Sequence, residues 1–180
     1  MPAQLKELGD RKMPEIAWGK IVGGPFKSKV IVISTKLGCD PSHLTSAMAF
    51  ETGESFSPSI RNRQSGAIGL IQFMPSTAQS LGTTTADLAS MSAIDQLDFV
   101  QKYLNPFKNK MNTLSDVYMT ILLPSAVGKA EAFVLFRNPT KAYRQNQGLD
   151  VNHDGQIAKG EAASKVQAKL GRGLDASRRG

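Results

Sequence analysis

Two glutamates at the end of an apolar run, Glu51 and Glu54, are the side chains best suited to acid–base chemistry in this sequence. Asp40 and Pro41 are typical of a helix start, because Asp caps the first turn and Pro suits the first helical position. The apolar residues that follow recur at the spacing of one helix face. That face contains Leu44, Ala47, Met48 and Glu51.

The position of Glu51 on this face predicts a general acid. A carboxyl group half-buried beside Met48 and Phe50 should have a pKa raised by desolvation, and an acid that works near neutral pH needs such a pKa. The alternative is an ordinary helix-end residue turned toward solvent, and the pattern alone leaves both open. Glu54 follows Gly53, which can end the helix in a left-handed conformation, so Glu54 is expected in a solvated loop. It is the fallback candidate for the acid.

A glycine-bearing loop farther along carries the candidate substrate-binding groups. Residues 61–68 are expected to form a loop or small hairpin at the mouth of the site, with Ser65 available to the substrate. Gly66 and Gly69 should let the backbone approach a sugar closely. Gln72 lies in an apolar run, where a buried amide needs partners. It could bond the catalytic carboxyl, a sugar N-acetyl group, or another group of the core.

Together these stretches resemble the lysozyme-like lytic transglycosylase family, of the soluble-lytic-transglycosylase type and its phage and prophage branch. The resemblance rests on Glu51, on Phe56-Ser-Pro58 and on the block from Gly66 to Ala78. That block matches Gly-Ala-x-Gly-Leu-(Met/Ile)-Gln-hydrophobic-Met-Pro-x-Thr-Ala almost throughout. The resemblance implies an all-α, lysozyme-like fold of the lytic transglycosylase and goose-type lysozyme kind.

Two departures from the family pattern affect the site. Many members place the catalytic glutamate three residues before the aromatic, where this chain has Gly53, so the apolar helix face is the reason for choosing Glu51. The family also usually carries Ala-Tyr-Asn-Ala-Gly downstream, with the tyrosine lining the site. This chain has Ile121 and Leu122 at the start of that stretch. Tyr118, about one helical turn earlier, is the candidate replacement, although such a tyrosine is more often a core residue.

The resemblance implies an enzyme that cleaves peptidoglycan at the β-1,4 bond between N-acetylmuramic acid and N-acetylglucosamine. Glu51 would protonate the bridging oxygen, the muramyl N-acetyl group would stabilise the cation, and the C6 hydroxyl would close an anhydro ring. No clear second carboxylate falls on the same face, which favours this route over a two-carboxylate glycosidase. No cofactor is expected for catalysis. A hydrolytic muramidase (lysozyme) and a non-catalytic wall-binding or virion structural module are the alternatives.

Residues 150–161 match the EF-hand calcium loop. Gly155 allows the sharp turn at the sixth position, and Ile157 is the usual hydrophobic anchor. Because the chain has one such loop, whereas sensor domains normally pair them, a structural Ca²⁺ ion is expected rather than a switch. The alternative is an acidic turn without metal. The expected ligands are Asp150, Asn152, Asp154, Gln156 through its carbonyl, and Glu161.

The remaining patterns predict one mostly helical domain, because no run alternates with period two. We expect an N-terminal extension at residues 1–24, a lysozyme-like catalytic domain at 25–147, and a calcium loop with a basic C-terminal helix and tail, packed on the same domain, at 148–180. The expected helices are 26–37, 75–81, one capped by Ser92 and ended by Asn105-Pro106, one capped by Thr113, a weaker one within 138–148, and 161–170.

The net charge of +7 admits several acidic partners, including the cell wall, whose peptide stems carry carboxylates. No recognition helix gathers this charge, so nucleic acid is not expected as a partner. The basic residues near the end predict a solvated tail, with weak contact to an anionic envelope surface as the alternative. They are Lys165, Lys169, Arg172, Arg178 and Arg179.

The sequence also indicates how such a protein would reach its substrate. The N-terminus has no apolar signal core, so the chain is expected to be made in the cytosol and to reach the periplasm through a holin or with a virion. The single cysteine, Cys39, excludes an internal disulfide and a cysteine-based zinc site. We expect a monomer.

Overall fold

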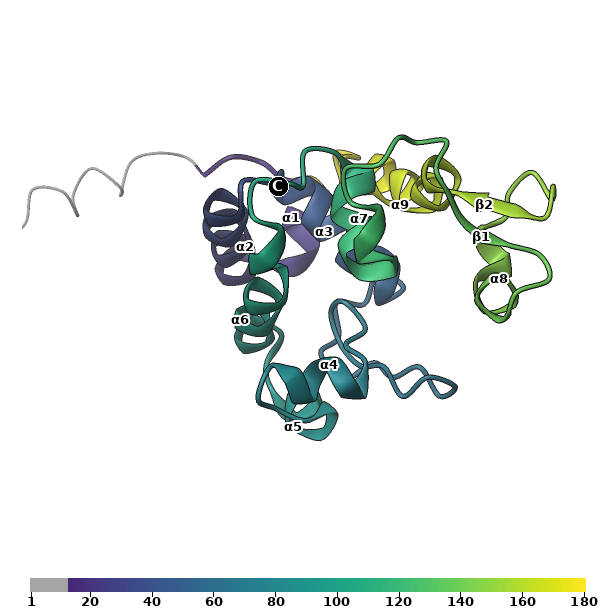
Figure 1. The fold of residues 1–180 in the computed structure, drawn as a ribbon. Helices are drawn as coiled ribbons and strands as arrows, with labels where there is room; N and C mark the ends of the chain where they lie inside the picture. The colour runs from purple at the N-terminus through teal and green to yellow at the C-terminus, as the bar shows by residue number, and fades with distance from the viewer. Residues whose placement is uncertain (1–12) are drawn as a thin grey trace, which may run out of the picture.

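The computed structural model describes residues 13–180, and helices make up most of this part of the chain (Figure 1). The mostly helical class expected from the sequence is confirmed. The first twelve residues of the expected N-terminal extension lie outside the described residues. The elements in chain order are α1 Gly19–Val22, α2 Gly24–Leu37, α3 Pro41–Glu51, α4 Pro75–Ser80, α5 Thr85–Ser90, α6 Ala93–Leu104, α7 Leu114–Leu122, β1 Val134–Arg137, α8 Lys141–Asn146, β2 Gln156–Ala158 and α9 Lys159–Gly173. Short 3-10 turns follow α6, α7 and α8 at Asn105–Phe107, Pro124–Ala126 and Gln147–Leu149.

Helix α3 is the central element, and α2, α7 and α9 pack against it. Its start is as expected: the Asp40 carboxylate accepts the Ser42 N–H at 2.7 Å, and Pro41 opens the helix. All its residues from Leu44 to Ala49 are buried. A helix buried on every side is held by tertiary packing rather than by its own propensity, so the position of its last residue is strongly determined.

The other helices predicted from apolar spacing and caps are confirmed. In α2, Phe26, Val30, Ile33 and Leu37 are all buried, and Gly38 ends the helix with φ of 70°. Ser92 and Thr113 cap α6 and α7 through their hydroxyl groups. Helix α9 begins earlier than expected, at Lys159.

Residues 16–19, within the stretch expected to be an N-terminal extension, are buried in the core. Ile16, Ala17 and Trp18 are almost completely buried. The Trp18 indole N–H donates to the Lys169 carbonyl in α9 at 3.1 Å, and the Thr45 hydroxyl donates to the Ala17 carbonyl at 2.9 Å. These bonds join the start of the described chain to α9 and α3.

The two-stranded antiparallel sheet of β1 and β2 was not predicted. Val134 pairs with Ala158 and Arg137 with Gln156. Strands of four and three residues are too short to show a period-two pattern. Because β2 lies within the segment 150–161, β1 gives the single EF-hand-like loop a strand partner. Figure 1 shows this sheet with α8 at one end of the molecule.

A buried ion pair ties the end of that sheet to α7. The Lys159 ammonium lies 2.6 Å from an Asp116 carboxylate oxygen, and both residues are at most 5% exposed. Burial alone would raise the Asp116 pKa, but hydrogen bonds from Lys159, Gly128 and Thr113 lower it instead. Because these hydrogen bonds compensate the burial of the Asp116 charge, the ion pair can orient α7 relative to α9.

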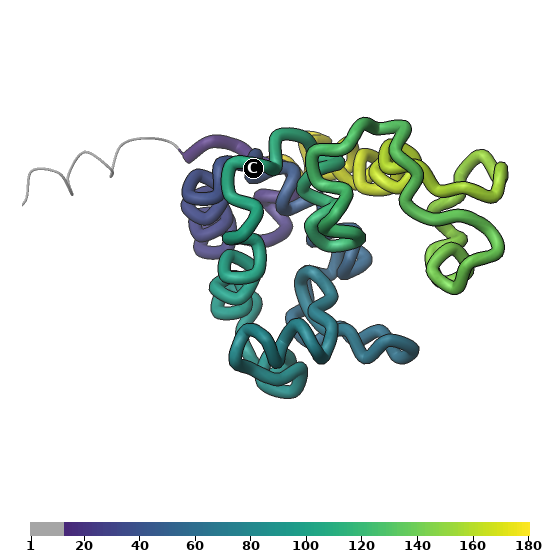
Figure 2. Tube along the Cα trace, viewed as in Figure 1, coloured from purple at the N-terminus to yellow at the C-terminus, as the bar shows by residue number. Residues whose placement is uncertain are grey.

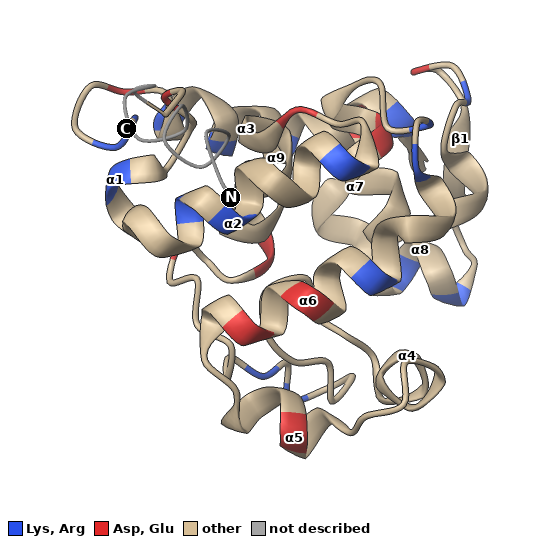
Figure 3. Cartoon of the chain, turned by 90° about the vertical axis from the view of Figure 1, so that its left-hand side faces the viewer, with Lys and Arg blue, Asp and Glu red and all other residues tan. Residues whose placement is uncertain are grey.

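The basic residues near the end do not form a solvated tail, so that prediction is wrong. Lys169 and Arg172 lie on α9 and pair with Glu54, while Arg178 pairs with Asp175. Charges of both signs are intermixed over the side of the molecule shown in Figure 3. Among residues 13–180, no helix is both long and apolar enough to cross a membrane.

Candidate functional site

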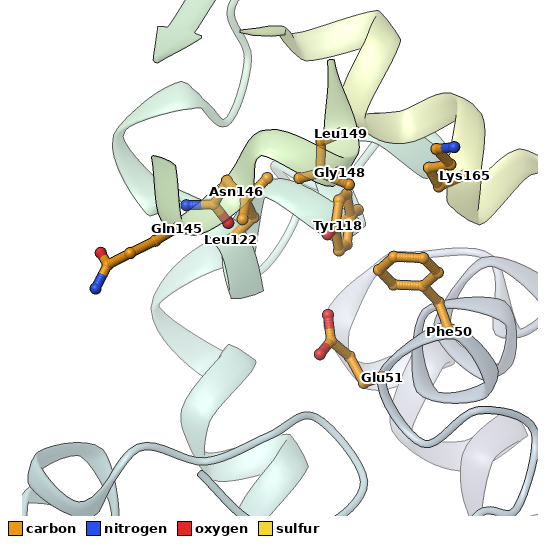
Figure 4. A pocket seen from close by; sticks show the side chains of 9 residues that line it. All are labelled: Phe50, Glu51, Tyr118, Leu122, Gln145, Asn146, Gly148, Leu149 and Lys165. Atoms are coloured by element: carbon orange, nitrogen blue, oxygen red, sulfur yellow. The ribbon is translucent and has the colours of Figure 1, made fainter. Parts of the chain in front are cut away.

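Two adjoining cavities meet at Glu51, at the end of α3. One, of about 520 Å³, lies between the end of α3, α7 and the segment after α8, and Figure 4 shows its side chains. The other, of about 380 Å³, lies toward the loop 52–74. Phe50, Glu51, Leu122 and Asn146 line both cavities. A third cavity, of about 370 Å³, continues from the second along Asn62, Gln64, Ser65 and Met74. We call these three connected cavities the cleft.

The Glu51 carboxyl group is partly buried in the cleft and has no partner. No side chain or backbone group among the described residues hydrogen-bonds to it or forms an ion pair with it. Burial raises its pKa from 4.5 to about 7. Such a carboxylic acid holds its proton near neutral pH and can give it to a bound substrate. In the part of the chain that the structure describes, no other acidic residue lines the cleft.

Thr52, which no sequence pattern pointed to, holds the turn after Glu51. The buried Thr52 hydroxyl donates to the Met48 carbonyl at 2.7 Å and accepts the Phe56 N–H at 3.0 Å. Gly53 takes φ of 58°, as expected for the residue after a helix end. The only sequence signal for Thr52 was its hydroxyl group next to the candidate acid.

Glu54 does not lie in a solvated loop, so this expectation is wrong. Its two carboxylate oxygens pair with Lys169, at 2.5 Å, and with Arg172, at 2.9 Å, both on α9. Its side chain is 20% exposed and does not line the cleft. Both of its carboxylate oxygens are engaged by cations of α9, so Glu54 anchors the turn after α3 to that helix.

The loop between α3 and α4 is held in place by Gln96, a buried residue of α6. Its side-chain oxygen accepts the Leu70 N–H at 2.7 Å, and its amide donates to the Pro58 and Leu88 carbonyls. A side chain at Gly69 would place Cβ 2.2 Å from the Gln96 oxygen. The sequence led us to expect that Gly69 lets a sugar approach the backbone. Gly69 is instead buried, and its small size makes room for Gln96.

Two of the predicted substrate-binding residues lie on the loop side of the cleft. The Gln72 amide donates to the Gly69 and Ile60 carbonyls, at 3.1 and 3.3 Å, so it makes structural hydrogen bonds while its side chain also lines the cavity shared with Glu51. No hydrogen bond joins Gln72 to Glu51 among the described residues. Ser65 is exposed and lines the cleft. Figure 2 shows this loop extending from α3 toward the side that carries α8.

Tyr118 lies beside Glu51 in the cleft. Its ring packs edge-to-face on Phe50, with ring centroids 5.4 Å apart. Burial, and then the charge of Glu51, raise the Tyr118 pKa, so its hydroxyl keeps its proton. Tyr118 lines the first cavity together with Glu51, Ile121 lines the second, and Leu122 lines both.

The opposite wall of the cleft was missed from the sequence. Gln145, Asn146, Gly148 and Leu149, at the end of α8 and in the turn after it, line the first cavity together with Lys165 of α9 (Figure 4). Residues of these types are common on protein surfaces and in turns, so they give no signal in a single sequence. They come close to Glu51 only because the sheet of β1 and β2 folds the segment after α7 back onto α9.

The loop 150–161 keeps its acidic side chains apart through backbone hydrogen bonds. Glu161 accepts the N–H groups of Val151 and Asn152, and Asn152 accepts that of Asp154. Asp150 accepts the Tyr143 hydroxyl at 2.5 Å and the Gly155 N–H at 3.1 Å. Among residues 13–180, no group of three or more His, Cys, Asp or Glu residues is arranged as a metal site.

One atom of this loop nevertheless fits a cation. The second carboxylate oxygen of Asp150, Oδ1, is buried and has no hydrogen-bond partner. A buried carboxylate oxygen without a partner is costly, and a bound cation would satisfy it. The other expected ligands are also oxygen donors, which Ca²⁺ prefers. The donor set of the loop therefore fits calcium chemically.

Comparison with known proteins adds no further constraint on this site. No family model matches the chain, and no curated protein and no solved structure matches it.

Proposed function

We propose that the chain is a peptidoglycan-cleaving enzyme with a lysozyme-like fold, acting as a lytic transglycosylase. The observation that carries the proposal is Glu51, a partly buried carboxyl group with a pKa of about 7. Among the described residues it has no partner, and no second acidic residue lines its cleft. The family resemblance of residues 51–78 supports the same reading. A second carboxylate across the cleft would instead indicate a two-carboxylate glycosidase.

In the proposed reaction, the protonated Glu51 donates its proton to the oxygen between N-acetylmuramic acid and N-acetylglucosamine. The muramyl N-acetyl oxygen stabilises the positive charge that develops at C1. The ionised Glu51 then removes the proton from the muramyl C6 hydroxyl, whose oxygen attacks C1 and closes the anhydro ring. The carboxyl group thus ends the cycle protonated, as it began. Tyr118 and Phe50 form the wall against which the sugars pack.

The loop 150–161 is proposed to hold one structural Ca²⁺ ion. Its ligands would be Asp150, Asn152, Asp154, the Gln156 carbonyl and Glu161. The ion would supply no catalytic chemistry, and would neutralise the loop next to the cleft wall. The enzyme is further proposed to act as a monomer on the wall in the periplasm, delivered through a holin or with a virion.

Mass spectrometry of digested peptidoglycan tests the function. A transglycosylase yields muropeptides with anhydro-muramic ends, whereas a hydrolytic muramidase yields reducing muramic ends. The hydrolytic alternative has one observation in its favour, because Ile121 and Leu122 line the cleft in the stretch where the family carries its tyrosine. Intact peptidoglycan after incubation with the folded wild-type protein would contradict both and leave a non-catalytic wall-binding or virion module.

A further inference from the structure

The cleft carries one positive charge, on Lys165 of α9. Among residues 13–180, Lys165 and Glu51 are the only charged residues that line its three cavities, and both line the cavity of about 520 Å³. Figure 4 shows Lys165 separated from Glu51, with Phe50 between them. The cavities on the loop side of Glu51 are lined by neutral residues only, apart from Glu51 itself. The cleft is therefore electrostatically asymmetric along its length.

Lys165 does not serve the proposed acid or the fold. The Glu51 pKa is raised by burial alone, so no nearby cation lowers it. Lys165 is exposed and forms no ion pair with any described residue. Its neighbours on the same face of α9 differ, because Lys169 and Arg172 are both engaged by Glu54. One turn earlier, Lys165 keeps its ammonium group available at the cavity.

We propose that Lys165 binds a carboxylate of the peptide stem on the muramyl residue that occupies this cavity. The inference rests on the proposed function and adds a specificity-determining residue to it. The glycan backbone is uncharged, whereas the peptide attached to each muramic acid carries carboxylates. A cation on one side of the acid and none on the other favours strands that place a stem-bearing sugar on the α9 side of Glu51. The ammonium group thereby orients the strand.

The test compares three glycan substrates: strands with native stems, strands whose stem carboxylates have been converted to amides, and strands stripped of stems by an amidase. Stripping removes the bulk of the stem but exposes the lactyl carboxylate of each muramic acid, so only the amidated strands remove the charge. The amidated strands keep the bulk of the stem and lose only its charge. The wild-type protein should cleave native strands with a kcat/KM about two- to fivefold higher than amidated strands, the range expected for a solvent-accessible ion pair. High salt should reduce this preference.

Variants assign the preference to Lys165. Lys165→Gln should cleave native and amidated strands equally well, and Lys165→Arg should keep the preference. Lys108→Gln, which removes an exposed charge away from the cleft, is the matched control and should behave as the wild type. Binding is measured separately with Glu51→Gln, by calorimetry on native and amidated strands, so that recognition is scored without turnover.

Three results would overturn the inference. The wild type could treat native and amidated strands alike, Lys165→Gln could keep the wild-type preference, or Lys165→Gln could lose activity on all three substrates to the same extent. Failure of the proposed function looks different, because the wild-type protein would then cleave none of the three substrates.

Discussion

The end of α3 and the loop 150–161 both place carboxylates in partly or fully buried positions, and they treat them in opposite ways. In the cleft, Glu51 receives no hydrogen bond and burial raises its pKa to about 7. In the loop, the Tyr143 hydroxyl, followed by backbone N–H groups, lowers the Asp150 pKa. The same chemical group is thereby kept as a proton donor in one region and as an anion in the other.

The difference shows that burial alone does not decide what a carboxylate does. The number of hydrogen-bond donors that side chains and backbone present to it decides whether its charged form is stable. The turn after Glu51 presents no donor to its side chain. The N–H groups of residues 52–54 donate to carbonyls of α3, and the Phe56 N–H donates to the Thr52 hydroxyl. The loop directs several donors inward, as Asx turns do. Four predictions test this contrast.

The largest expected effect is the loss of activity in Glu51→Gln. The substitution removes the transferable proton and changes the volume little, so the fold should persist while the cleavage rate falls by about 10²- to 10⁴-fold. The measurement is release of soluble muropeptides, with circular dichroism to verify folding. Glu54→Gln is the matched control: it breaks two partly exposed ion pairs, should cost about 1 kcal/mol of stability, and should retain most activity. The reverse ranking would make Glu54 the acid.

The second effect is the pH dependence of cleavage. A general acid must be protonated in the free enzyme, so kcat/KM should be high below pH 7 and fall as the pH rises through about 7. Well above the pKa, the decrease should be about tenfold per pH unit. A rate profile over this range, measured where the fold is intact, checks the prediction. A fall centred between pH 4 and 5 would mean that Glu51 behaves as a solvated carboxyl group.

The third effect is on stability: Glu51→Gln, which should abolish activity, should make the protein more stable than the wild type at higher pH. Since the folded pKa of Glu51 exceeds its unfolded value of 4.5, the wild type loses stability as the pH rises from 4.5 through about 7. Glu51→Gln does not titrate, so its free energy of unfolding relative to the wild type should rise by about 3 kcal/mol between pH 4 and pH 8. Urea denaturation at both pH values measures this difference. Parallel stability curves would show that Glu51 is well solvated.

The smallest of the four effects is that of calcium on the loop. An ion that binds only the folded protein stabilises it by about 2.7 kcal/mol at a hundredfold excess over Kd, so calcium should raise the melting temperature and a chelator should lower it. Asp150→Ala should reproduce the chelator's effect and make the protein insensitive to it. Superimposable wild-type melting curves with calcium and with chelator would leave the loop as an acidic turn without metal.

The local signals in the sequence were sufficient for the helices and for the position of Glu51. Asp40 and Pro41 determine where α3 begins, and Gly53 allows its end, so Glu51 is placed in the last turn of a buried helix. These are interactions between residues within two helical turns of one another, so a single sequence contains them completely.

The surroundings of Glu51 were decided only by tertiary structure. Pairing of Glu54 with α9, the Gln96 bonds across 26 and 38 residues, and the wall at residues 145–149 all join distant segments. No local pattern encodes such contacts, because each depends on how the helices and the small sheet pack. The same holds for the loop at 150–161, whose first proposed ligand, Asp150, follows directly on cleft residue Leu149 although Glu51 is far away in the chain. The sequence by itself determined which carboxyl group faces inward, and packing decided that it meets no partner there.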